Sequence, residues 1–101
     1  MNKSEALDRL RRIRELISEF GRPNEPAKDE LLRITRELKA AGSDNQYFAE
    51  KLASLERLAD VGFSARKHKS VAGAAAQVRV FALADLGTAT SVAQESTLFP
   101  D

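Results

Sequence analysis

Apolar residues recur at alternating steps of four and three in three successive stretches, and this spacing limits the possible fold more than any other feature. It is the spacing of helices that bury one face. The three stretches also match one another at a period of 21 residues. The aligned positions are Ala6, Ala27 and Phe48; Leu10, Leu31 and Leu52; Ile13, Ile34 and Leu55; and Ile17, Leu38 and Ala59.

Two short segments rich in helix-breaking residues interrupt this pattern. A period of 21 residues is three heptads, so one long coiled-coil helix would show the same register. However, the segment GRPNEP at 21–26 contains two prolines, and Asn24 and Asn45 would occupy core positions of a continuous helix. We therefore predict three separate antiparallel helices on short loops, rather than one coil or a family of true repeats.

Capping residues indicate where these helices begin and end. Side chains of Asn and Ser accept hydrogen bonds from the first free backbone amides of a helix, and glycine commonly follows its last turn. The first helix is expected to start at Asn2 or Ser4, with Glu5 forming a capping box on Asn2. The second is expected to start at Asn24, with Pro26 in its first turn, and the third at Ser43, with Gln46 forming a second capping box. The three helices are expected to end at Gly21, Gly42 and Gly62.

The stretch Val71 to Ala93 differs from the first three because it has no continuous polar stripe. Its only charged residues are Arg79 and Asp85. A helix that is apolar all round is normally buried, so we expect a central helix that the other three cover. An alternation over 77–83 also has some strand character, but the Ala-rich flanks favour helix.

These elements predict an all-α fold, a small antiparallel bundle of about four helices with the last one the most apolar. At 101 residues the chain fits one domain, which we place at 1–95, followed by an extended tail at 96–101. The length of 71–93 would suffice to cross a bilayer. Arg79 and Asp85 would each cost about 2.5 to 3.5 kcal/mol at mid-span, so no membrane segment is expected.

Composition and motifs exclude most catalytic classes. The chain has no cysteine and one histidine, which rules out disulfides and thiolate zinc sites and makes a histidine-based metal cage implausible. No phosphate loop, nucleophile elbow or His-Glu metal motif occurs. The neighbouring carboxylates Asp29 with Glu30, and Glu56 with Asp60, are interpreted as solvated surface. We therefore expect a non-enzymatic protein without cofactor or metal. The charged N-terminal segment does not resemble a secretion signal, so a cytoplasmic location is expected.

Two groups of basic residues are candidate sites for binding nucleic acid. One group is the cluster Arg66, Lys67, His68 and Lys69, with Arg79 later in the chain, and it contains no acidic residue. Nucleic-acid binding by these residues is the alternative functional hypothesis. A connector that only keeps the protein soluble would have the same composition. The arginines at 9, 11, 12 and 14 are interspersed with Glu5, Asp8 and Glu15, which neutralise most of their charge. The net charge is only +1, so any attraction to nucleic acid would be local.

The leading hypothesis is a protein–protein interaction module, acting as a regulator, inhibitor or adaptor, that also self-associates into a homo-oligomer. Three one-sided helices are not expected to cover the whole surface of the fourth. The candidate partner-binding residues are Val80 and Leu83, together with Leu98 and Phe99, which are expected to dock on the bundle or on a partner. The pattern does not identify the partner.

Overall fold

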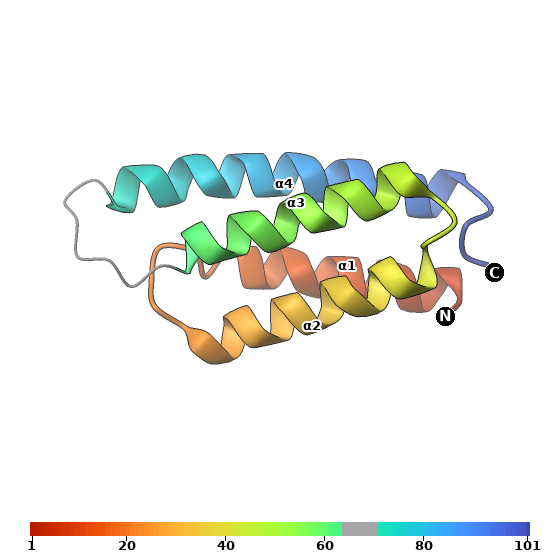
Figure 1. Cartoon of the computed structure of the whole chain (residues 1–101), viewed down its shortest axis with the longest axis horizontal. Helices are drawn as coiled ribbons and strands as arrows, with labels where there is room; N and C mark the ends of the chain where they lie inside the picture. The colour runs from red at the N-terminus through yellow and green to blue at the C-terminus, as the bar shows by residue number, and fades with distance from the viewer. Residues whose placement is uncertain (64–70) are drawn as a thin grey trace.

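The protein is an antiparallel bundle of four helices, as predicted (Figure 1). The computed structural model describes residues 1–63 and 71–101, apart from the side chains of 71–74. Its helices are α1 (Lys3–Ile17), α2 (Glu25–Ala41), α3 (Gln46–Gly62) and α4 (Val71–Glu95). Each helix runs opposite to the one before it, so both termini lie at the same end of the bundle (Figure 1). Residues 77–83 are helical, and their strand-like alternation has no structural counterpart.

The core is built from the apolar positions that repeat along the sequence. All twelve residues aligned by the period of 21 are buried, with at most 7% of any of them exposed. Thr35 is the buried polar residue of the described part of the chain, and its hydroxyl donates to the Leu32 carbonyl, which satisfies it within the helix. The heptad spacing therefore predicted the core of the first three helices correctly.

The prediction of a central fourth helix is wrong. Helix α4 packs against α1 and α3, and α2 packs against the same two helices, so each helix occupies one corner of the bundle. A corner helix buries one side only. The buried residues of α4 in the described range are Ala75, Ala82, Leu86, Ala89 and Ala93.

Asparagine caps explain why the interrupting segments end one helix and start the next. The Asn2 side chain accepts from the Glu5 amide, and the Glu5 side chain accepts from the Asn2 amide, which is the predicted capping box. Asn24 caps α2 as predicted. The prediction of Ser43 as the cap of α3 is wrong by two residues, because Asn45 accepts from the Phe48 amide at 2.9 Å.

The C-terminal tail belongs to the folded bundle. The Phe99 ring is 1% exposed and packs edge-on against Phe48, with the ring centroids 5.5 Å apart. The Lys3 amide donates to the Pro100 carbonyl at 2.6 Å, which ties the tail to the first turn of α1. Residues 96–101 thus close the end of the bundle at which the chain begins.

At the opposite end, the segment that follows α1 meets the last residue of α3 through a glycine pair. The Gly21 amide donates to the Gly62 carbonyl at 2.8 Å, and Gly21 has a φ of 103°, a conformation that side-chain-bearing residues rarely adopt. A Cβ atom on Gly62 would lie 2.5 Å from the Phe20 ring, which itself packs edge-on against Phe63. The backbone of α3 therefore approaches Phe20 more closely than any side chain would allow.

Two glycine-to-alanine variants test this packing. Gly62→Ala is expected to lower the free energy of unfolding by about 1 to 3 kcal/mol, because the new methyl group displaces the Phe20 ring. Gly87→Ala is the matched control, since a Cβ atom there meets nothing within 4 Å, and it should raise stability by up to about 1 kcal/mol through helix propensity. Urea unfolding measures both. Equal effects of the two substitutions would contradict the close approach at Gly62.

Candidate functional site

The two charged residues in the middle of α4 both bond to neighbouring helices. The Asp85 carboxylate accepts a hydrogen bond from the Ser54 hydroxyl at 2.5 Å and lies 3.7 Å from the Lys51 ammonium, both on α3. On the other flank, an Arg79 Nη2 donates to the Phe20 carbonyl at 2.6 Å, just beyond the end of α1. These contacts with opposite neighbours determine how α4 is rotated about its own axis.

This rotation turns the larger apolar side chains of α4 outward. Val80 is 65% exposed, Phe81 53% and Leu83 36%, whereas the inward residues are mostly alanine. From Ala75 to Gln94, every exposed residue of α4 is uncharged. We define the outer face of α4 by its exposed apolar residues in this range, together with the glycine between them: Ala76, Val80, Phe81, Leu83, Ala84 and Gly87.

The outward surfaces of the other three helices are different, because ion pairs connect them. Arg9 bonds Glu37 across α1 and α2 at 3.1 Å, Lys28 lies 3.0 Å from Asp60 across α2 and α3, and Lys39 pairs with Glu56 across the same two helices. The outer face of α4 is therefore uncharged, in contrast to the outward surfaces of the other three helices.

A groove runs between α1 and α4 beside this outer face. It encloses about 280 Å³. Four leucines contribute to its lining, and at Gly87 the absence of a side chain leaves the groove open. The residues that line what we call the α1/α4 groove are Leu7, Leu10, Arg11, Arg14, Leu83, Leu86, Gly87, Thr90 and Gln94.

The α1/α4 groove is lined by two arginines and no carboxylate. Arg11 pairs with Asp8 at 2.8 Å, and both side chains remain mostly exposed to water. No ion pair of Arg14 occurs within residues 1–63 and 71–101. The groove therefore combines an apolar lining with the positive charge of Arg14, which has no ion-pair partner among the described residues, and with Arg11, which is paired to Asp8.

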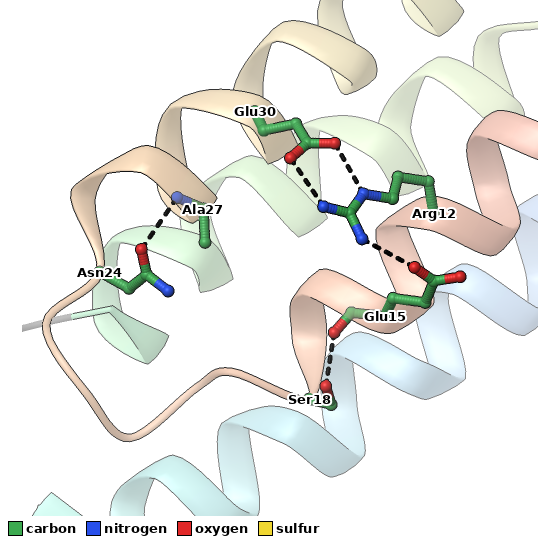
Figure 2. A network of polar contacts seen from close by, with 6 residues as sticks. All are labelled: Arg12, Glu15, Ser18, Asn24, Ala27 and Glu30. Carbon is green, nitrogen blue, oxygen red and sulfur yellow. Dashed lines mark hydrogen bonds and ion pairs between the residues drawn. The ribbon is translucent and has the colours of Figure 1, made fainter.

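A second hollow lies between α1 and α2, and the charged residues of its lining are Arg12, Glu15, Glu19 and Glu30. The Arg12 guanidinium donates to both oxygens of Glu30, at 2.7 and 2.9 Å, and to Glu15 at 2.7 Å (Figure 2). The hydrogen bonds from Arg12 lower the pKa of Glu30, and those to Glu30 and then Glu15 raise the pKa of Arg12. Arg12 bonds two of the three glutamates in the lining, so this hollow keeps a net negative charge and contrasts with the α1/α4 groove.

The structure brings some of the predicted partner-binding residues together and separates others. Val80 and Leu83 lie on adjacent turns of the outer face of α4. Leu98 is half-buried against the core, and Phe99 is fully buried in it. The tail residues therefore dock on this chain's own bundle, which removes Phe99 from an exposed partner-binding surface.

Of the residues predicted as a nucleic-acid site, Arg79 alone lies in the described part of the chain. Arg66, Lys67, His68 and Lys69 lie outside the described residues. Arg79 is half-buried and bonded to the Phe20 carbonyl, and its Nε atom is buried without a hydrogen-bond partner among the described residues. Arg79 is therefore a structural residue that connects α4 to α1.

Sequence reasoning missed Phe81, Arg11 and Arg14. The expected exposed surface of α4 was placed at Val80 and Leu83 and did not include Phe81, which is 53% exposed. The sequence does indicate that Arg14 lacks an ion-pair partner within its own helix, because no acidic residue stands three or four positions before or after it. The general neutralisation expected for the arginines of the first helix holds for Arg9 and Arg12, which bond Glu37 and Glu30, but not for Arg14.

Further features narrow the chemistry that the described residues support. They contain no group of three or more histidine, cysteine or acidic side chains arranged to hold a metal ion. Among the described segments, none of the helices has the combined length and apolarity that crossing a bilayer requires.

No family model matches the chain, and no curated protein and no solved structure matches it either.

The Arg12–Glu30 pair predicts part of the acid sensitivity of the fold. Because the folded-state pKa of Glu30 is lowered, its stabilising effect is present above the unfolded pKa and is lost as the pH falls through the folded value. Glu30→Gln should therefore flatten the fall in urea midpoint on acidification. Arg12→Gln should flatten it as well, and the double variant no more than Arg12→Gln alone. Additive losses would show that the two groups act independently.

Proposed function

We propose that this protein is a small non-enzymatic interaction module, a regulator, inhibitor or adaptor, that binds protein through the outer face of α4 and self-associates through the same face. One observation carries the proposal. Helix α4 directs four alanines inward and Val80, Phe81 and Leu83 outward. A helix that served only the core would gain about 1.5 to 3 kcal/mol for each large apolar side chain that it buried. Because these three side chains are exposed, the free energy of burying them remains to be gained when the protein associates.

The continuity of the surface supports this proposal. Single exposed apolar side chains are common on soluble proteins and need no explanation. Here three of them occupy adjacent turns of one rigid helix, with Ala84 and Gly87 between and after them and no charged residue exposed. Contiguous apolar patches of this kind are typical of protein-binding surfaces.

The side chains that could perform acid–base chemistry are engaged elsewhere, which supports a non-enzymatic role. Glu30 is bonded to Arg12, Glu56 to Lys39 and Asp60 to Lys28. The Ser54 hydroxyl donates to Asp85, and no histidine is near either residue among those described. A cytoplasmic location is part of the proposal, because a chain without cysteine has no need of an oxidising compartment.

Self-association is tested by light scattering over micromolar concentrations. The mass of the wild-type protein is expected to rise with concentration, and Val80→Glu should keep it at that of a monomer because two buried carboxylates would face each other. Val80 is 65% exposed, so the variant should fold normally, as circular dichroism would check.

Tyr47→Glu provides the matched control. Tyr47 is 52% exposed and lies in the first turn of α3, outside the outer face of α4, so this variant should associate like the wild type. A wild-type protein that stays monomeric throughout would overturn the self-association part of the proposal, and equal effects of the two variants would remove its assignment to α4.

A further inference from the structure

We infer that the α1/α4 groove is a docking site for an acidic amphipathic helix of a partner protein. The inference rests on the proposed function in treating the chain as an interaction module. It concerns the groove beside the outer face of α4, which shares Leu83 and Gly87 with that face, and it names the chemistry of the partner. Three properties of the groove lead to it: its length, its lack of free backbone groups and its charge.

The groove has the proportions of a helix-binding site. Its lining on α4 extends from Leu83 to Gln94, about 16 Å at 1.5 Å per residue. At about 280 Å³ it is below the roughly 300 to 1,000 Å³ of pockets that enclose a drug-sized ligand. An open, elongated groove of this size accommodates a few large side chains from one face of a partner helix.

The backbone around the groove favours a helical partner over an extended one. An extended peptide obtains much of its affinity by pairing with the free edge of a sheet. Both walls here are helices, whose amides and carbonyls bond within α1 and α4, and the Thr90 hydroxyl donates to the Leu86 carbonyl of its own helix. A helix satisfies its own backbone groups and needs only an apolar surface, as the leucines of the groove provide.

The charge of the groove specifies an acidic partner. Arg11 and Arg14 are three residues apart on α1, so they project from adjacent turns along the same edge. Acidic side chains on adjacent turns of a docked helix would match this spacing. Two copies of this chain that met groove to groove would instead place arginines on both sides of the contact, with no carboxylate in the lining of either copy.

Gly87 is the point at which the anchor residue of the partner would dock. A Cβ atom there would meet no other atom within 4 Å, and Leu83 and Leu86 line the groove on either side of its turn. A leucine or phenylalanine of the partner fits this opening. Gly87→Leu is therefore expected to fill the groove from within, while also favouring the helix that carries it.

The test uses a labelled synthetic helix with leucine at the a and d heptad positions and glutamate elsewhere, followed by fluorescence anisotropy with the full chain. We expect this acidic peptide to bind, with affinity that falls as salt is added. The same peptide with lysine in place of glutamate should not bind. An acidic peptide with a central proline, which cannot continue the helix, should bind much more weakly.

Variants of the chain separate the contributions of shape and charge. Gly87→Leu should abolish binding of the acidic peptide, and Gly87→Ala, the smaller change at the same position, should weaken it less. Reversal of both groove charges, Arg11→Glu with Arg14→Glu, should weaken the acidic peptide by about tenfold and allow the lysine peptide to bind. Circular dichroism of each variant confirms that the bundle is intact.

Several outcomes would overturn the inference. Equal binding of the glutamate and lysine peptides, full binding to Gly87→Leu, or full binding of the proline-containing peptide would each do so. Self-association that the Arg11→Glu, Arg14→Glu variant changes and Val80→Glu leaves intact would assign the groove to a second copy of the chain instead. If no peptide binds while Val80→Glu still disrupts self-association, the groove inference fails and the proposed function stands. The converse result would remove the role of the outer face and leave the groove.

Discussion

The rotation of α4 is the feature on which the surface of this protein depends. An evenly apolar helix has almost no preferred side to bury, so its few polar contacts decide the matter. Asp85 bonds Ser54 of α3, and Arg79 bonds the Phe20 carbonyl at the end of α1. With both flanks held, the alanines face the core, and Val80, Phe81 and Leu83 face water.

The distribution of charge over the bundle follows from the same arrangement. Ion pairs join α1 to α2 and α2 to α3, and Arg12 with Glu30 is the most fully bonded of them. The contacts of α4 with its neighbours are made by its own two charges, by apolar residues and, near its C-terminal end, by the Gln94 carbonyl, which accepts from the Lys3 ammonium. Positive charge on the α4 side of α1 therefore has no carboxylate opposite it, and the surface becomes polarised between a balanced half and an apolar, basic half.

Local signals predicted the first three helices well because each signal acts over a few residues. The four-three spacing determines which residues can share one helix face, and the asparagine caps act within one turn. Ser43 was predicted as the cap of α3 because Gln46, three residues later, completes a capping-box pattern, but Asn45 can also cap a helix. Which residue caps α3 depends on where the backbone changes from extended to helical. Residue identity alone does not specify that position.

The amino-acid sequence by itself determined the number of helices, their boundaries to within a few residues and the composition of the core, since periodicity and capping are local properties. Only the tertiary structure decided which side of α4 faces outward, that Phe99 closes the core, and that Arg14 lines a groove with leucines of α4. The physical reason is that these features arise from contacts between residues far apart in the chain, such as Ser54 with Asp85 and Phe48 with Phe99. No spacing along one segment encodes such contacts.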